Sequence, residues 1–322
     1  MKKSKIKLEG SFKMKKATRL KQLIGKDQIL IIPGVYDALG AKIAENSGFE
    51  AIIMGGYPTA ASRLGQPDVG YVTMTEMAEN AKYIANAVDI PLFVDGDTGY
   101  GNALSVMRTV KEFEQAGVSG IFFEDQKWPK RCGHMEGKRV ISIEEHCKKI
   151  EAAVKAKEDP DLVIVARTDA RAVNGIDDAI KRGNAYSKAG ADLIFIEAPQ
   201  SVDELKLIAK SIKAPKLVNV IEHGRTPSLT AAEYHKMGFD VVIFPLSCIY
   251  TVSKALKSLF KKLKEDGTTK GIEKDMISFN EFNKLIGLPN YRKLEEKFLT
   301  DSVIKDKYGS KEKLEEAMRQ GR

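Results

Sequence analysis

Cysteine and long apolar runs are scarce in this sequence. Its 322 residues include three cysteines and no CxxC pair, so we expect neither a disulfide framework nor a structural zinc site. No stretch is apolar over the length of a membrane span, and the first residues lack the apolar segment of a signal peptide. The sequence therefore predicts a soluble protein of the reducing cytoplasm.

Basic residues are in excess, and the net charge of +8 first suggests a nucleic-acid partner, because neutralising phosphates takes clustered Lys and Arg. Much of the excess, however, lies at the two ends and in helical patterns such as KALKSLFKKLKED, where lysines flank an apolar stripe. No zinc-finger or RNA-recognition pattern is present. We therefore expect no nucleic-acid partner and no membrane partner.

Eight short apolar runs are spaced along the chain, with amphipathic helical stretches between them. This alternation indicates a parallel sheet covered by helices, and eight such units at this length predict a (β/α)₈ barrel. A doubly wound sheet is the alternative, but the segment DGDTGYG lacks the GxGxxG spacing of a dinucleotide-binding fold. The runs cover residues 29–34, 51–56, 91–97, 120–125, 162–169, 193–199, 216–222 and 241–247.

Both ends of the chain extend beyond the predicted barrel. Residues 1–16 are basic, include a second plausible start at Met14, and are expected to be a poorly ordered extension. Residues 17–322 are predicted to be a single barrel domain with a helical tail. The helical sequence after Ser247 is longer than one barrel unit needs, so we expect the tail to pack on another part of an assembly.

Polar residues follow the predicted strands directly, where barrels of this kind carry their working groups. Asp95, Asp97 and Glu124 follow the third and fourth strands. Converging carboxylates without thiolate or imidazole favour Mg²⁺, which keeps water ligands and uses one or two carboxylates directly. The alternative is that each acid caps the next helix. Arg167, after the fifth strand, suits a substrate carboxylate, or else pairs with the neighbouring acids.

Cys132 stands in a loop rich in glycine and lysine after the fourth strand. Arg131 and His134 are close in sequence, and we expect their positive charge to lower the pKa of the thiol. Gly133 suggests a loop that moves. A lone cysteine is also commonly an inert apolar filler, which is our interpretation of the other two cysteines. For Cys132 both interpretations remain open.

Four segments, GGYPTAASRLGQPDVG, DGDTGYGN, EDQKWPKRCGHMEGK and VARTDAR, resemble the isocitrate lyase and phosphoenolpyruvate mutase superfamily. Within it, the sequence is most similar to the branch of 2,3-dimethylmalate lyase, petal death protein and 2-methylisocitrate lyase. The resemblance runs from PGVYDALGAKIAE to FNEFNKLIGL. It implies a TIM-type barrel that uses Mg²⁺ or Mn²⁺ to cleave a carbon–carbon bond of a 2-hydroxy dicarboxylate. The products would be an α-keto acid such as pyruvate and an enolate-like fragment.

The resemblance also implies roles for individual residues. Asp95 and Asp97 match the family's metal acids, with Glu124 in the surrounding shell and Asp68 nearby. Cys132 matches the cysteine of the gating loop, the general acid that protonates the departing carbanion. The expected substrate contacts are Gly55, Gly56, Tyr57, Lys130, Arg131, Gly133, His134, Arg167, Asn219, Glu222 and Ser247.

Two positions depart from the family pattern. Gly55 stands where a serine is common, and Ile53 stands where 2-methylisocitrate lyases have a tyrosine. If that phenol is the base of those enzymes, Tyr57 is the candidate that replaces it. The loop sequence KRCGH argues against a phosphonate-metabolising mutase, since the mutases of the superfamily carry a different loop without this cysteine.

Substrate choice leaves several hypotheses. Tyr57 and Trp128 would narrow the variable end of the site and favour 2,3-dimethylmalate over 2-methylisocitrate. Ser247 could bind hydrated oxaloacetate, which would make the protein an oxaloacetate hydrolase forming oxalate and acetate, or it could cap the following helix. A remote alternative is a non-catalytic scaffold. The resemblance further implies a homotetramer with exchanged carboxyl-terminal helices.

Overall fold

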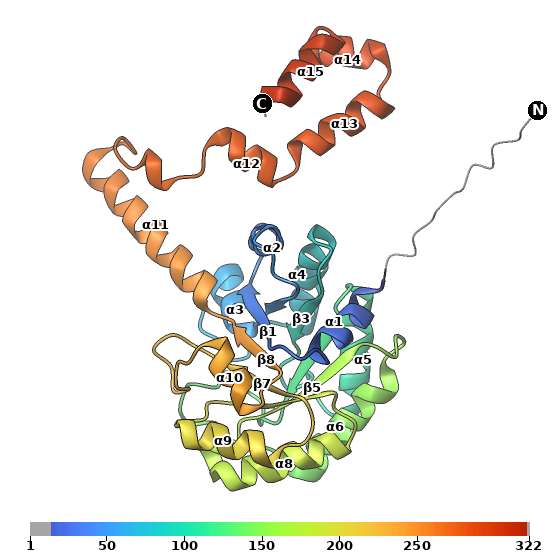
Figure 1. Cartoon of the computed structure of the whole chain (residues 1–322), viewed down its shortest axis with the longest axis vertical. Helices are drawn as coiled ribbons and strands as arrows, with labels where there is room; N and C mark the ends of the chain where they lie inside the picture. The colour runs from blue at the N-terminus through green and yellow to red at the C-terminus, as the bar shows by residue number, and fades with distance from the viewer. Residues whose placement is uncertain (1–13, 321–322) are drawn as a thin grey trace, which may run out of the picture.

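The computed structural model describes residues 14–320 and forms a closed barrel with a helical tail (Figure 1). All eight strands are parallel and pair in chain order, with β8 closing onto β1. Each predicted apolar run overlaps one strand, which confirms the (β/α)₈ fold. The strands are β1 (Leu30–Val35), β2 (Ile52–Met54), β3 (Leu92–Asp95), β4 (Gly120–Glu124), β5 (Val163–Thr168), β6 (Leu193–Ile196), β7 (Lys216–Asn219) and β8 (Val241–Phe244).

Helices cover the outside of the barrel, and several begin at the residue types that satisfy free backbone amides. Thr73 and Thr230 each form a capping box with the glutamate three residues later, and Asn102 and Ser142 cap the two helices that flank β4. The barrel helices are α1 (Lys16–Ile24), α2 (Ala38–Asn46), α3 (Gly56–Leu64), α4 (Met74–Ala87), α5 (Ala103–Gln115), α6 (Ile143–Ala156), α7 (Ala170–Asn174), α8 (Ile176–Lys188), α9 (Val202–Ser211) and α10 (Ala231–Met237).

The interior of the barrel is filled by side chains, so it is a packed core and not a channel. Phe122 packs edge-on against Phe93 and Phe195, with ring centroids 5.3 and 6.1 Å apart. Leu20 and Leu23 of α1 belong to the same buried cluster, and so α1 closes the amino-terminal end of the barrel. The opposite end, where the strands finish, is left for polar groups.

Most of the predicted amino-terminal extension, residues 1–13, lies outside the described part of the chain. Lys16, the last residue assigned to that extension, begins α1. Its ammonium group donates to the carbonyl oxygens of Ala85 and Val88, at 2.6 Å each. The described barrel therefore includes this residue.

The tail extends away from the barrel (Figure 1). None of the residues of α11 (Ser247–Asp266) is buried, and Phe260, Phe279 and Phe298 are largely exposed. Among the described helices, none combines the length and hydropathy needed to cross a membrane. The tail continues with a 3₁₀ turn (Glu273–Asp275), α12 (Phe279–Leu285), α13 (Leu288–Phe298), α14 (Asp301–Tyr308) and α15 (Lys311–Gln320).

Gly34 on β1 lies against the backbone of Pro245, and a Cβ at residue 34 would come within 2.2 Å of the Pro245 carbonyl oxygen. We expect Gly34→Ala to lower the free energy of unfolding by about 1–3 kcal/mol, because backbone cannot move aside as a flexible side chain can. Thermal unfolding followed by circular dichroism measures the loss. Gly25→Ala is the control, since its nearest atoms are 3.8 Å away. Equal stability of the two variants would contradict the prediction.

Candidate active site

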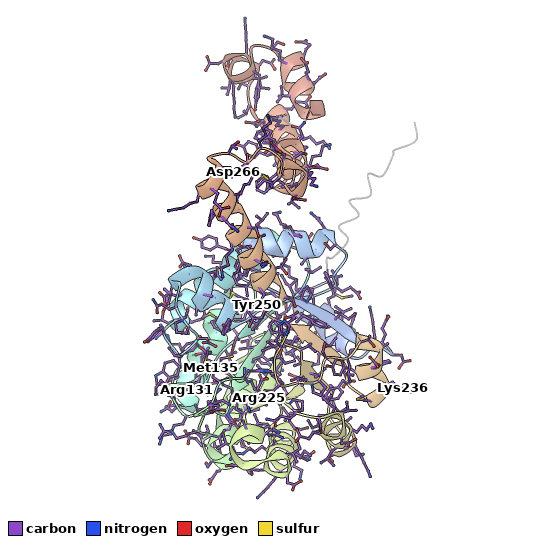
Figure 2. The ribbon with its side chains drawn as sticks, turned by 90° about the vertical axis from the view of Figure 1, so that its left-hand side faces the viewer. Arg131, Met135, Arg225, Lys236, Tyr250 and Asp266 are labelled. Carbon is purple, nitrogen blue, oxygen red and sulfur yellow. The ribbon has the colours of Figure 1, made fainter. Side chains whose placement is uncertain are left out.

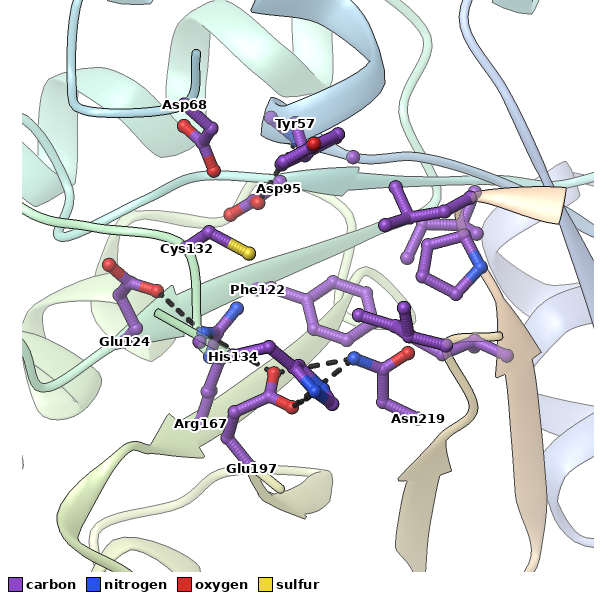
Figure 3. Close-up of a pocket in the computed structure, with 18 of the residues that line it drawn as sticks. Tyr57, Asp68, Asp95, Phe122, Glu124, Cys132, His134, Arg167, Glu197 and Asn219 are labelled. Atoms are coloured by element: carbon purple, nitrogen blue, oxygen red, sulfur yellow. Dashed lines mark hydrogen bonds and ion pairs between the residues drawn. The ribbon is translucent and has the colours of Figure 1, made fainter. Parts of the chain in front are cut away.

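A pocket of about 60 Å³ opens where the strands end, inside the carboxyl-terminal rim of the barrel (Figure 3). The register of the parallel strands helps to form it, because Glu124 on β4 and Arg167 on β5 are paired positions. Most of the predicted site residues come together here. Those that line the pocket are Gly55, Gly56, Tyr57, Asp68, Asp95, Glu124, Lys130, Arg131, Cys132, Gly133, His134, Arg167 and Asn219.

Lys130 is buried between two carboxylates at one side of the pocket. Its Nζ lies 2.6 Å from Asp68 Oδ1 and 2.6 Å from Asp97 Oδ1. Burial opposes the charged form of the lysine, but attraction to Asp97 and Asp68 outweighs it and raises the Lys130 pKa well above its usual range. Lys130 therefore stays protonated and connects the loop after β4 to the strand-end acids.

Asp95 is oriented by backbone amides. The amide of Gly56 donates to Oδ2 at 3.1 Å, and the amide of Asp97 donates to Oδ1 at 3.0 Å. A Cβ at residue 56 would lie 3.2 Å from both Asp95 Oδ2 and Lys130 Nζ. The start of α3 thus approaches the acids closely because residue 56 has no side chain.

The four predicted metal acids lie near one another, but they do not form a ready-made cage. Within residues 14–320, no three or more His, Cys, Asp or Glu side chains are arranged to hold a metal ion directly. Lys130 lies between Asp68 and Asp97, so these two carboxylates already share a cation. Mg²⁺ needs only one or two direct carboxylates when water fills its other positions, so Asp95 and Glu124 still suit a hydrated ion.

Glu124 provides the test of that fit. Its Oε1 is buried and accepts no hydrogen bond from any described residue. Burial raises the Glu124 pKa well above its usual range, although Arg167 opposes the shift. The site has more buried carboxylate than its own basic groups neutralise, and so its residues fit a divalent cation with bound water.

Arg167 reaches the opposite side of the pocket from β5. Its guanidinium donates to Asp169 at 2.9 and 3.1 Å, and it lies 3.4 Å from Glu124 and 3.3 Å from Glu197. The ion-pair alternative for this residue is therefore observed. Arg167 also lines the pocket over the ring of Phe195, so pairing with acids and contact with a ligand are compatible.

A buried carboxylate behind the pocket fixes the acid that holds Arg167. Asp125 accepts hydrogen bonds from the Thr168 hydroxyl at 2.7 Å and from the backbone amide of Asp169 at 2.9 Å. It also accepts from Tyr186 Oη at 2.7 Å and Arg182 at 3.1 Å. This network joins β4, β5 and α8, and it leaves the Asp169 carboxylate directed at Arg167.

The loop that carries Cys132 is closed over the pocket. The side chain of Gln126 bonds both the carbonyl and the amide of Arg131, at 2.8 and 3.0 Å. Lys138 donates to the carbonyls of Gly133 and Met135, and the Cys132 amide donates to the Asp68 carbonyl at 3.3 Å. These bonds give the loop one defined conformation.

The prediction of a lowered thiol pKa is wrong. Burial raises the pKa of Cys132 to about 11, and the nearby carboxylates of Asp68 and Glu197 add to the rise. The basic neighbours in the sequence do not act as expected, because Lys130 is paired with acids and the Arg131 side chain donates to the carbonyl of Glu136 instead. Cys132 is therefore a protonated thiol at neutral pH.

Glu197, at the end of β6, is a site residue that the sequence did not assign. It lies 3.1 Å from His134 Nε2 and accepts from Asn219 Nδ2 at 3.3 and 3.4 Å (Figure 3). Burial alone would raise its pKa, but Arg167 and His134 lower it to about 2. The available signal was its position, since it follows an apolar run in the same way as the other strand-end acids.

Four residues that the sequence assigned to the site do not line the pocket: Glu222, Ser247, Trp128 and Asp97. Ser247 donates to Glu222, and neither lines the pocket, because Ser247 is already the first residue of α11. Pro245 and Leu246 line the pocket after β8 instead. Trp128 lies against Gly70 in a separate cavity, and the residue is 46% exposed. Asp97 lies behind Lys130 and does not line the pocket.

Comparisons with known proteins identify the relatives of this chain. Residues 20–264 match the family described as phosphoenolpyruvate phosphomutase. The 2,3-dimethylmalate lyase of Eubacterium barkeri is 47% identical over 89% of this chain and 99% of its own length. The chloroplastic carboxyvinyl-carboxyphosphonate phosphorylmutase of Arabidopsis thaliana is 47% identical over 87% of this chain and 84% of its own. The 2-methylisocitrate lyase of Bacillus subtilis is 42% identical over 90% of this chain and 95% of its own length.

Comparison with solved structures identifies related proteins as well. A crystal structure of 2,3-dimethylmalate lyase has a TM-score of 0.83 at 36% identity and covers 88% of this chain and 95% of its own. Oxaloacetate acetylhydrolase in complex with 3,3-difluorooxalacetate has a TM-score of 0.83 at 34% identity. The match covers 88% of this chain and 96% of the hydrolase chain. Phosphonopyruvate hydrolase in complex with oxalate and Mg²⁺ has a TM-score of 0.81 at 32% identity. The match covers 89% of this chain and 100% of the hydrolase chain.

The raised pKa of Cys132 predicts slow alkylation near neutral pH. With a pKa of about 11, about one thiol in a thousand is ionised at pH 8, and the rate should rise with pH toward that value. Iodoacetamide labelling resolved by peptide mass spectrometry measures the rate for each cysteine. A midpoint below pH 9 for Cys132 would contradict the buried, protonated thiol.

Proposed function

The chain belongs to the phosphoenolpyruvate mutase and isocitrate lyase superfamily, and on that premise we propose that it is a divalent-metal-dependent carbon–carbon lyase acting on 2,3-dimethylmalate. The observation that carries the proposal is the position of Cys132, which its loop places in the same pocket as Arg167 and the acid Asp95. A lyase needs a proton donor at this point, because cleavage leaves an electron pair on carbon.

The proposed reaction separates C2 from C3 of the substrate. A base removes the proton of the C2 hydroxyl, the C2 oxygen becomes the keto oxygen of pyruvate, and the electron pair of the broken bond goes to C3. The Cys132 thiol gives its proton to C3, which completes propionate and leaves a thiolate. Tyr57, which lines the pocket from the start of α3, is our candidate for the base.

We propose that the keto-acid end of the substrate lies between Arg167 and the start of α3. The guanidinium offers a planar donor for a carboxylate. The first turn of α3, beginning at Gly56, adds backbone amides and the positive end of the helix dipole. Lys130, Arg131 and His134 are proposed to contact the second carboxylate from the closed loop.

We propose Mg²⁺, or Mn²⁺, as the cofactor, held by Asp95 with Glu124 and Asp68 around its water ligands, while Asp97 acts through its ion pair with Lys130. The unpartnered oxygen of Glu124 supports this assignment, as does the Mg²⁺ in the related phosphonopyruvate hydrolase structure. When bound, the ion supplies positive charge beside the oxygen on which negative charge develops. The residues of the chain position these acids: the amide of Gly56 orients Asp95, and Lys130 forms ion pairs with both Asp68 and Asp97.

The apolar wall of the pocket supports a methylated malate. Ile221, Pro245 and Leu246 close the side toward β7 and β8, and they suit methyl groups better than the third carboxylate of 2-methylisocitrate. The argument for an oxaloacetate hydrolase was a contact from Ser247 to hydrated oxaloacetate, and Ser247 donates to Glu222 outside the pocket. The KRCGH loop remains our argument against a phosphonate mutase. The presence of Asp95, Glu124, Arg167 and Cys132 in one pocket argues against a non-catalytic scaffold.

We also propose a homotetramer in the cytoplasm, in which α11 and the following helices are exchanged between subunits. The exposed apolar side chains of the tail, Phe260, Phe279 and Phe298, support packing against another chain. The three cysteines are all free thiols, which suits a reducing compartment.

The lyase proposal predicts pyruvate from 2,3-dimethylmalate in the presence of Mg²⁺. Cys132→Ser should lower kcat by at least about a hundredfold, since a positioned general acid contributes 10²–10⁴-fold. Coupled detection of pyruvate, glyoxylate and oxalate on 2,3-dimethylmalate, 2-methylisocitrate, isocitrate and oxaloacetate makes the comparison. Cys147→Ser is the matched control and should keep wild-type activity, because Cys147 lies on α6 outside the pocket.

The same assay has outcomes that would overturn the proposal. Oxalate from oxaloacetate, without pyruvate from 2,3-dimethylmalate, would make the protein a hydrolase. Turnover that survives EDTA treatment would remove the metal from the reaction, and activity that Mg²⁺ fails to restore after EDTA would point to another ion. An unchanged kcat in Cys132→Ser would show that the thiol is not the acid.

The assembly proposal predicts a particle of about four times the chain mass of 35.6 kDa. Mass photometry or light scattering measures it. Truncation after residue 246 should reduce the particle to smaller species, because the exposed apolar helices would be lost. A full-length protein that stays monomeric at micromolar concentration would contradict the exchange of helices.

A further inference from the structure

Two loops meet over the pocket, one after β4 (residues 130–138) and one after β7 (residues 221–227). The backbone amide of Arg225 donates to His134 Nδ1 at 3.1 Å, and the guanidinium of Arg225 lies 3.3 Å from Glu136 Oε1. Figure 2 shows Arg225 on the same face as Arg131 and Met135 of the first loop. The contact therefore joins segments about ninety residues apart in sequence.

Gly224 allows this contact because it has no side chain. A Cβ at residue 224 would lie 2.9 Å from both Nδ1 and Cε1 of His134, and 2.9 Å from the carbonyl oxygen of Ile221. Gly224 is not among the glycines with positive φ, so its backbone conformation is open to other residues. The need for glycine at this position is a need for space between the His134 ring and the Ile221 carbonyl.

The Arg225 amide also determines which nitrogen of His134 carries the proton. Because Nδ1 accepts a hydrogen bond, the proton of the neutral ring is on Nε2, which lies 3.1 Å from Glu197 Oε1. The ring thus bridges the loop after β7 and the end of β6. Its side chain is 12% exposed, so the ring is largely removed from water.

The contacts that fix the position of His134 also fix the position of Cys132, because both residues belong to one hydrogen-bonded turn. The amide of Met135 donates to the Cys132 carbonyl at 2.9 Å, and Lys138 donates to the carbonyls of Gly133 and Met135. These bonds make residues 132–135 one turn. When the ring is fixed at its Nδ1, the thiol two residues away is fixed over the pocket.

We propose that Gly224 and the backbone amide of Arg225 are positioning groups that act through His134 to keep the Cys132 loop closed over the pocket. The effect on turnover rests on the proposed lyase function. The effect on the accessibility of the thiol does not, because it concerns only the conformation of the loop.

The test measures alkylation of Cys132 by iodoacetamide in the full-length protein without substrate. Gly224→Ala should raise the rate about five- to tenfold, because the added methyl displaces the ring, weakens one hydrogen bond and lets the loop open. Arg225→Ala is the matched control: it keeps the backbone amide and loses only a pair with Glu136, whose side chain is 90% exposed. It should alkylate at nearly the wild-type rate.

A double-mutant cycle separates the proposal from a general disturbance of the loop after β7. With His134→Ala as the background, the ring is gone and only the contact with the Ile221 carbonyl remains, so adding Gly224→Ala should raise the rate of alkylation by a smaller factor than it does with His134 present. An equal increase in both backgrounds would overturn the proposal. So would a wild-type rate in Gly224→Ala while circular dichroism shows an intact fold.

Turnover gives a second and independent readout. If the lyase function holds, Gly224→Ala should raise KM for 2,3-dimethylmalate by a larger factor than it lowers kcat, because closure around bound substrate becomes less favourable. A lower kcat with unchanged KM would overturn the positioning role. A protein inactive on the whole substrate panel would refute the proposed function, and the alkylation rates would still decide whether Gly224 holds the loop.

Discussion

The excess of buried carboxylate at the carboxyl end of the barrel is the constraint on which the rest of the site depends. A buried charge is tolerated only when it is paired or protonated, so each acid there has to find a cation or keep its proton. Lys130 and Arg167 each contact at least two carboxylates, and the pKa of Glu124 is raised by burial. The two cations therefore decide where the strand ends and the loop after β4 can lie.

Lys130 connects this charge balance to the movement of a loop. It belongs to the same segment as Cys132, while its partners Asp68 and Asp97 come from the segment before α4 and from the end of β3. Closing the loop and neutralising these acids are consequently one event. The cost of leaving three buried charges unpaired disfavours any closed state in which Lys130 is misplaced.

Much of this site could be predicted from the sequence, because polar residues that directly follow apolar runs must lie at one end of a parallel barrel. That rule identified Asp95, Glu124 and Arg167, and the loop motif identified Cys132. The rule fails where one or two residues of register decide the outcome. At the end of β8, Pro245 lines the pocket while Ser247 has already turned into α11.

Two other features could not be predicted because they depend on contacts between distant segments. The thiol pKa depends on burial and on the carboxylates of Asp68 and Glu197, and local sequence shows only the basic neighbours. The role of Glu197 depends on His134 and Arg167, which come from different strand ends. The basic neighbours in the sequence predicted a lowered pKa for Cys132, whereas burial, with the carboxylates of Asp68 and Glu197, raises it.

The protonated thiol in its closed loop has a consequence for the cycle of the enzyme. In the proposed reaction Cys132 is left as a thiolate after each turnover, in a place where burial makes that charge costly. The base still holds the proton that it took from the C2 hydroxyl, and solvent that enters when the loop opens can carry a proton from the base to the thiolate. The same opening that releases the products would therefore also allow Cys132 to regain its proton. One movement of the loop would end one turnover and prepare the acid for the next.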